Sequence, residues 1–430
     1  MILTTEVLDG SQSTLSLRDP VSLLQQLVAI PSVNPMGKDL TGPIYFEHGM
    51  TNWLIRFFQQ LDIPYEVHEV SRGRCNVVAR LDSPDAPSTV LLDAHQDTVP
   101  VDGMEIDPFK PVIRDGRLYG RGACDVKGGM AAMLAAFARL AQTRPSGAAN
   151  VVMSCTCDEE YTATGAESLA RHWLQSDLPD SLISSPPDLC IVAEPTDLHV
   201  VVAHRGVLRW KLRTLGRACH SSRPHEGRNA IYSMAQVLQV LQQYAEDLPR
   251  MSGSHPLCGT ATLSVGRING GTSVNIVPHE CEIEIDRRLI PGEHPETVLA
   301  DLNAYLHSRT NAEYEMLPAW IVAAPLADGD NHVWADRLLR QIAEVSGVRE
   351  KQGAWYGTNA SSFAAAGVPS IVYGPGSIAQ AHTADEWIEL TQLEQASETY
   401  YRFCTDPIEG VRGEGTGVRE IQEMGSADGC

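Results

Sequence analysis

The stretch Val151-Val-Met-Ser-Cys-Thr-Cys-Asp158-Glu159-Glu160 decides the fold that the sequence predicts. The run from Val151 to Cys157 is largely apolar or β-branched, which is typical of a buried strand, and three acids follow it. In open α/β sheets, ligands usually bind at this carboxyl end of the strands. Three adjacent carboxylates repel one another unless water or a positive group lies among them. A solvated surface turn is the ordinary explanation for such a cluster, so the rest of the chain must decide.

The length and composition indicate a two-domain globular protein. A chain of 430 residues is too long for one compact core. Its 54 acidic and 33 basic residues give a formal charge of −21, which disfavours nucleic acid or an anionic membrane surface as a partner. We see no signal peptide and no apolar run near the ~20 residues of a membrane helix. Ten scattered cysteines without a CxxC pair predict a reduced, cytoplasmic chain.

Further strand-like segments alternate with helical ones and also end in polar residues. Thr89–Ala94 is followed by His95, and Asp188–Ala193 is followed by Glu194. This alternation predicts an α/β fold with a doubly wound mixed sheet as the catalytic domain. Between 204 and 316 the pattern changes to strand, helix, two strands and helix, which predicts an inserted α+β sandwich. We therefore expect a discontinuous first domain, 1–203 and 317–405, and a disordered tail, 406–430.

Two candidate groups have an ordinary alternative explanation. His95 and Asp97 point to the same face of an extended chain, and a carboxylate often holds the second nitrogen of a metal-bound imidazole. Asp97 would otherwise cap a turn. Asp125 precedes a long predicted helix, where it would either cap the helix or direct its carboxylate into the same cleft as His95.

Nitrogen and oxygen donors of the first domain form a set that suits two Zn²⁺-like ions sharing one carboxylate. The members are His95, Asp125, Glu160, Glu194 and His382. Two neighbouring cations can polarise a carbonyl and acidify a water molecule. Glu159 would then be the free carboxylate that moves the proton to the leaving amine.

Five motifs, taken in order, resemble the dinuclear zinc aminoacylase and peptidase family over residues 20 to 405. That family includes acetylornithine deacetylase, succinyl-diaminopimelate desuccinylase and glutamate carboxypeptidase. The motifs are His95-Gln-Asp97-Thr-Val-Pro, Gly120-Arg-Gly-Ala-Cys-Asp125-Val-Lys-Gly-Gly, Asp158-Glu-Glu160, Glu194-Pro-Thr and Gly374-Pro-Gly-Ser-Ile-Ala-Gln-Ala-His382. The last one is most similar to acetylornithine deacetylases.

The resemblance implies a role for each metal-centre residue. Asp125 would bridge the two metals, Glu159 would be the general base and Asp97 would orient His95. The implied ligand sets are His95, Asp125 and Glu194 for one ion, and Asp125, Glu160 and His382 for the other.

The resemblance also makes the inserted domain a lid through which a homodimer forms. His220 would be lent across that dimer to stabilise the tetrahedral oxyanion. Asn275 and Arg288 match residues that bind a substrate carboxylate, and Gly376 is assigned to the substrate site on the same basis. The neighbouring Arg287 departs from the usual pattern and leaves open which arginine faces the substrate.

The implied activity is hydrolysis of an N-acyl amino acid, with N-acetylornithine as the expected substrate and zinc as the expected metal. Cobalt or manganese would fit the same ligands. Alternatives within the family are a succinyl-diaminopimelate desuccinylase and a dipeptidase or carboxypeptidase. A non-catalytic homologue is a different class, but neither Glu159 nor any ligand is missing. A thiol enzyme using Cys155 and Cys157 lacks an accompanying base.

Overall fold

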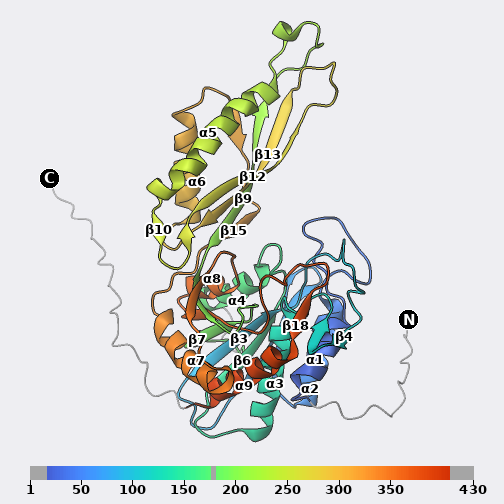
Figure 1. Cartoon of the computed structure of the whole chain (residues 1–430), viewed down its shortest axis with the longest axis vertical. Coiled ribbons are helices and arrows are strands. Elements are labelled where there is room, and N and C mark those ends of the chain that lie inside the picture. The colour runs from blue at the N-terminus through green and yellow to red at the C-terminus, as the bar shows by residue number, and fades with distance from the viewer. Residues whose placement is uncertain (1–16, 176–180, 407–430) are drawn as a thin grey trace, which may run out of the picture.

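The strand predicted from Val151 lies inside an eight-stranded mixed sheet (Figure 1). The computed structural model describes residues 17–175 and 181–406, so the predicted tail beyond residue 406 lies outside the described residues. The strands, in spatial order, are β1 (Tyr65–Ser71), β2 (Arg74–Leu81), β6 (Asn150–Thr156), β3 (Thr89–His95), β7 (Leu189–Val192), β17 (Ser370–Val372), β8 (Val200–His204) and β16 (Lys351–Ala354). β6, β3, β7 and β17 are mutually parallel, and β1 and β2 pair antiparallel to their neighbours. β8 is antiparallel to β17 and parallel to β16.

Helices cover both faces of this sheet, as the doubly wound prediction requires. Leu92 of β3 packs into the core beneath the larger helical layer, and Leu91 packs into the core on the opposite face. This alternation follows from the two-residue period of a strand. The larger layer consists of α1 (Pro20–Val28), α2 (His48–Gln60), α3 (Lys127–Thr143), α7 (Asn331–Ser346) and α9 (Leu390–Thr405). The smaller layer consists of α4 (Thr164–Gln175) and α8 (Ala360–Ala365). The predicted α/β class is confirmed.

A second sheet with two helices rises from the α/β domain, and we call it the lid (Figure 1). Its spatial order is β12 (Thr262–Gly270), β13 (Glu280–Leu289), β9 (Gly206–Leu215) and β14 (Tyr314–Met316), and β15 (Ile321–Ala323) also pairs with β9. α5 (Ala230–Met251) and α6 (Pro295–His307) bury the apolar face of this sheet. β15 belongs to the lid sheet although it follows the predicted boundary at residue 316, and the domain boundaries stay a prediction.

The remaining elements are short. β4 (Val112–Arg114), β5 (Arg117–Tyr119) and β18 (Trp387–Glu389) form a small sheet, β10 (Ser254–His255) pairs with β11 (Gly259–Thr260), and η1 (Pro224–Glu226) is a 3₁₀ turn. Among the described helices, none has the length and apolar character needed to cross a membrane.

Candidate metal centre

Three adjacent parallel strands deliver acidic and imidazole groups to one edge of the large sheet. β3 ends at His95, which lies opposite Thr156 of β6, so the turn that carries Glu160 begins beside it. β7 borders β3 on the other side and leads into Glu194. Because the carboxyl ends of parallel strands meet at the same edge, residues far apart in sequence converge there.

Two groups of donor atoms share the carboxylate of Asp125. His95, Asp125 and Glu194 each offer an atom within 4.8 Å of the others, and Asp125, Glu160 and His382 do the same. Asp125 Oδ1 lies 3.1 Å from His95 Nε2, and Oδ2 lies 3.2 Å from His382 Nε2. Of the two explanations left open for Asp125, the helix cap finds no support, because its carboxylate faces the two imidazoles and α3 has no side-chain cap.

The donor atoms fit a pair of divalent cations. The carbonyl oxygen of Asp97 lies 2.9 Å from His95 Nδ1 and can only accept, so this nitrogen carries a proton. Nε2 is then the atom that a neutral ring would offer to a cation, and it lies 3.1 Å from Asp125 Oδ1. In the described part of the chain, the buried Oε1 of Glu160 has no hydrogen-bond partner. An unpaired carboxylate oxygen in this position is a further free ligand atom.

Burial and mutual repulsion raise the pKa values of Glu159 and Glu160. Burial acts on Asp125 as well, but hydrogen bonds from His382 and His95 outweigh it and lower the pKa of Asp125. Burial, together with the charges of Glu160 and Asp125, raises the pKa of Glu159 to about 8. Burial and the charge of Asp125 raise the pKa of Glu160 to about 7. Hydrogen bonds to Asp125 and Glu160 raise the pKa of His382 to about 11. Positive charge among these carboxylates favours their ionised forms, so the site is built to gain cations.

The carboxylate of Asp97 holds the backbone of the acidic turn. Its Oδ1 accepts the N–H of Glu159 at 3.1 Å, and its Oδ2 accepts the N–H of Glu160 at 3.2 Å. The same Oδ1 lies 3.7 Å from His95 Nδ1. His95 is therefore held by the backbone carbonyl of Asp97, while the side chain positions the two glutamates.

Sequence reasoning missed a buried network behind this turn. Asn34 Nδ2 donates to Asp97 at 2.8 Å and to Asp158 at 2.9 Å. Arg74 pairs with Asp158 and with Glu47, which is fully buried. These residues come from separate segments, and no local motif marked them.

Glu386 positions Asp125 in the same way as Asp97 positions the acidic turn, by accepting backbone N–H groups. Its Oε1 accepts the backbone N–H groups of Cys124 at 2.8 Å and Asp125 at 3.0 Å. Its Oε2 accepts from Arg121 at 2.7 Å. The carboxylate thus fixes the segment that presents Asp125. The sequence offered one signal, the acid four residues after His382.

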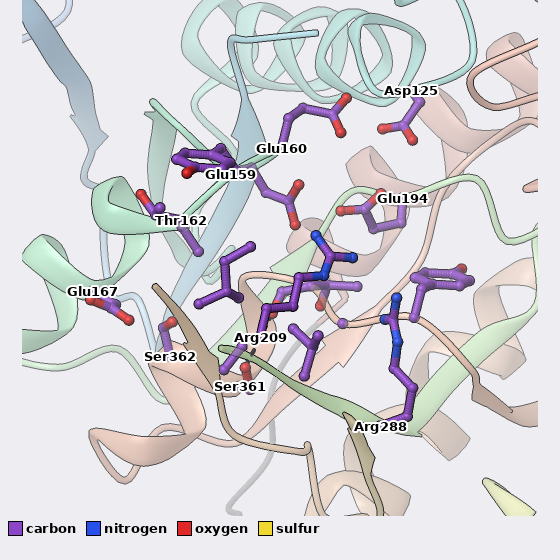
Figure 2. A pocket seen from close by; sticks show the side chains of 18 of the residues that line it. Asp125, Glu159, Glu160, Thr162, Glu167, Glu194, Arg209, Arg288, Ser361 and Ser362 are labelled. Atoms are coloured by element: carbon purple, nitrogen blue, oxygen red, sulfur yellow. Dashed lines mark hydrogen bonds between the residues drawn. The ribbon is translucent and has the colours of Figure 1, made fainter. Parts of the chain in front are cut away.

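A cavity of about 180 Å³ lies between the metal centre and the lid (Figure 2). Arg288 of β13 lines it, whereas Arg287 is buried in the lid and pairs with Glu293 at 2.6 Å. The question of which arginine faces the cleft is thereby answered in favour of Arg288. Arg209 of β9 lines the same cavity and was not predicted.

The two cleft arginines share one carboxylate. Asp286 Oδ2 accepts from Nε of Arg209, and Oδ1 accepts from Nε of Arg288, both at 2.8 Å. Within the described residues, no hydrogen bond uses the terminal amino groups of either guanidinium. These groups remain available to an anion in the cleft.

Three predicted residues lie away from this cavity. His220 is exposed in the loop between β9 and α5, where Ser222 hydrogen-bonds its Nδ1 at 2.8 Å. Asn275 lies in the loop between β12 and β13, and its carbonyl accepts from Ser221 at 3.0 Å. Both loops are at the end of the lid remote from the α/β domain (Figure 1). Gly376 is buried, and its N–H donates to Gln392 at 2.8 Å.

The protein has a mixed α/β sheet, two donor sets joined by one carboxylate, and a free glutamate in the same cleft. These features are those of a metal-dependent hydrolase. The chain belongs to the peptidase family M20/M25/M40, whose model matches residues 91–406. The sequence-based family assignment and the hydrolase class are confirmed. A solved M20 peptidase from Bacillus subtilis, described as dinuclear metal binding, has the same fold, with a TM-score of 0.61, 16% identity, and coverage of 91% of this chain and 98% of that one.

Curated relatives and solved structures agree on the family. An acetylornithine deacetylase of Aliivibrio salmonicida is 30% identical over 88% of this chain and 97% of its own length. That of Pasteurella multocida is 32% identical over 83% and 90%. An M20 metallo-carboxypeptidase from Sulfolobus solfataricus has a TM-score of 0.71 at 19% identity, covering 90% of this chain and 98% of that one. A Staphylococcus aureus tripeptidase has a TM-score of 0.69 at 20% identity, covering 91% and 99%. These structures share the fold.

Proposed function

We propose that this protein is an amidohydrolase that removes the acyl group from N-acyl amino acids, with N-acetylornithine as the expected substrate. The observation that carries the proposal is the cleft in which Glu159 and Arg288 line one cavity with the shared carboxylate of Asp125. The relatives that match over most of the chain are named acetylornithine deacetylase, which supports this substrate class.

The ligand assignment follows the two donor sets. His95, Asp125 and Glu194 would hold one ion, and Asp125, Glu160 and His382 the other. Bound cations would polarise the scissile carbonyl and acidify a water molecule. Zinc is the expected metal because its ligands are imidazoles and carboxylates, and cobalt is the alternative that the same donors accept.

Glu159 would move the proton. Its carboxylate lines the cavity and belongs to neither donor set, so it is free to accept a proton from water and pass it to the leaving nitrogen. Asp97 would keep it in place through the backbone N–H that it accepts at 3.1 Å. Glu159 therefore has both the position and the freedom that a general base needs.

Arg288 would bind the α-carboxylate of the substrate. Its guanidinium is anchored through Nε to Asp286, which leaves the planar terminal pair directed at the ligand. Gly376 is not among the described residues that line the cavity and its N–H is already bonded, so any contribution to the substrate site would come through the shape of the loop that carries it.

We also propose that the lid forms a homodimer in the cytoplasm. His220 and Asn275 lie at the remote end of the lid, and a second copy would bring this end to its partner's cleft, where His220 would stabilise an oxyanion. The nine described cysteines are free, which supports a reducing compartment. The size of the purified protein in solution tests the dimer.

The activity is tested by measuring amine release in the presence of zinc, cobalt or a chelator. The compounds tested are N-acetyl, N-succinyl and N-formyl amino acids and dipeptides. Metal-dependent cleavage centred on N-acetylornithine supports the proposal. A preference for N-succinyl-diaminopimelate or dipeptides would replace the substrate and keep the site. The solved M20 neighbours include a tripeptidase and a carboxypeptidase, which favours a peptide substrate as the second candidate. Absence of any cleavage by the metal-loaded protein would favour a non-catalytic homologue.

A further inference from the structure

The catalytic cleft carries opposite charges at its two ends. Arg209 and Arg288 line it from the lid, and Glu167 lines it from α4. In Figure 2, Glu167 and Arg288 lie at opposite sides of the pocket, with the metal-centre acids between and above them. Of the acids that line this cavity, Glu167 is the one that does not belong to the metal centre: the others are Asp125, Glu159, Glu160 and Glu194.

Glu167 is half-buried and lacks a hydrogen-bonded partner in the described chain. Burial raises the pKa of its carboxyl, although the charge of Arg171 acts in the opposite direction. An acid in the first turn of a helix is commonly explained by the helix dipole, and a basic residue four positions later by a surface ion pair. Neither effect requires this carboxylate to line a cavity, since both also act at a solvent-exposed helix surface.

Glu167 also marks the point where the cleft continues outward. A second cavity of about 390 Å³ shares Glu167, Ser361 and Ser362 with the first. α4 packs against α8, which brings Ser362 beside this junction. The hydroxyl of Ser361 donates to the carbonyl of Thr358, whereas no described group hydrogen-bonds the hydroxyl of Ser362. A carboxylate and a free hydroxyl are thus available to one ligand group.

The charges of the cleft define what such a ligand carries. At the lid end, two guanidinium groups share one carboxylate, which leaves one positive charge for one substrate carboxylate. At the other end, Glu167 and Glu296 line the outer cavity together with Arg171, so one negative charge is left over and calls for one positive charge. A substrate with a second carboxylate would place this group against Glu167, and the two negative charges would repel each other.

We propose that Glu167 and Ser362 form a subsite for a cationic group on the side chain of the substrate, so that the cleft selects basic N-acyl amino acids. This inference rests on the proposed function. Glu167 would accept hydrogen bonds from the ammonium group, and Ser362 would accept another. The carboxylate at the lid and the ammonium at α4 would fix the scissile amide between them at the metal centre.

The test compares N-acetylornithine with N-acetylnorvaline, which has the same carbon chain without the amine, and with N-acetylglutamate. We expect zinc-loaded wild-type protein to have the lowest KM for N-acetylornithine. Glu167→Gln should raise that KM about tenfold and leave the KM for N-acetylnorvaline unchanged, because a hydrogen bond to a charged group is lost. Glu167→Lys should reverse the order in favour of N-acetylglutamate. Glu394→Gln, an exposed acid on α9, is the matched control.

The outcomes separate the two proposals. If wild-type protein cleaves N-acetylnorvaline as well as N-acetylornithine, or if Glu167→Gln weakens both equally, the subsite is overturned and the hydrolase proposal stands. If wild-type protein cleaves none of the three with metal bound, the proposed function fails and the subsite fails with it. Unchanged melting temperatures of both variants exclude misfolding as the cause of a change in KM.

Discussion

The carboxylate of Asp97 accepts the backbone N–H of Glu159 at 3.1 Å. Its second oxygen accepts the N–H of Glu160, so one side chain fixes both glutamates of the acidic turn. Asp97→Ala should therefore lower kcat about 100-fold, because a general base displaced by a fraction of an ångström loses its alignment. Asp97→Asn retains one acceptor oxygen and should be less damaging. His95 is held by the backbone carbonyl, so both variants should keep an intact His95 site when metal content is measured.

Glu159→Gln should bind two metals and lose most of its turnover. The amide has nearly the shape of the carboxylate but accepts no proton, and loss of a general base typically costs 10²- to 10⁴-fold in rate. Metal content by mass spectrometry and kcat on N-acetylornithine check this. Asp125→Ala is the contrasting variant, since removal of the shared carboxylate should empty both sites. Turnover near wild type in Glu159→Gln would assign the base elsewhere.

Metal removal should destabilise the protein. A cation present at 1,000 times its Kd stabilises the folded state by about 4 kcal/mol, and the buried acids repel one another without it. We expect a chelator to lower the melting temperature and added Zn²⁺ to restore it. In Asp125→Ala the chelator should have little effect. A melting temperature that is the same with and without chelator in the wild type would argue against resident metals.

Stability should fall in mild acid because of a histidine outside the metal centre. His204 Nδ1 donates to the carbonyl of Arg205 at 3.0 Å, and Thr358 donates to its Nε2 at 3.1 Å, so the ring is neutral. Burial lowers its pKa to about 4. In the unfolded chain the pKa is about 6.5, so only the unfolded form gains a proton between these values. The contribution of His204 to the free energy of unfolding is complete above pH 6.5 and is lost as the pH falls toward 4, by about 3 kcal/mol for a pKa shift of this size.

Urea unfolding of wild type and His204→Gln at pH 7 and pH 4.5 isolates this effect. Glutamine does not titrate, so the difference in free energy of unfolding between the two proteins should shrink at low pH. The metal centre titrates in both proteins and cancels in the comparison. A difference that is constant with pH would show that His204 is not the group responsible.

The metal ligands and the general base could be proposed from the sequence because each stands in a short motif, whether after a strand, as Glu160 does, or just before a helix, as Asp125 does. Asp97, Asp125 and Glu160 are recognisable by their immediate neighbours. Most residues that support them are not, because Asn34, Arg74 and Glu47 are recognised only by their contacts across the fold.

Arg209 was missed for a different reason. β9 alternates buried and partly exposed residues, and its polar face carries Arg209, Lys211 and Arg213. In the sequence all three look like solvated positions of a half-exposed strand. The placement of this strand over the α/β domain brings Arg209 to the cleft, while the other two pair with lid acids. The period of a strand predicts which face a residue occupies, but the partner of that face depends on how the domains meet.

Arg209 should strengthen substrate binding beside Arg288. Both are anchored through Nε to Asp286 at 2.8 Å, so their terminal amino groups form one anion site. Arg209→Leu should raise KM about tenfold with a smaller change in kcat, because a charge-assisted hydrogen bond made in both ground and transition states is lost. Lys211→Leu, two residues along the same face, is the matched control and should keep the wild-type KM. If Arg209→Leu binds N-acetylornithine normally, Arg288 alone holds the substrate carboxylate. The charge of Arg209 must then be counted as neutralised by Asp286.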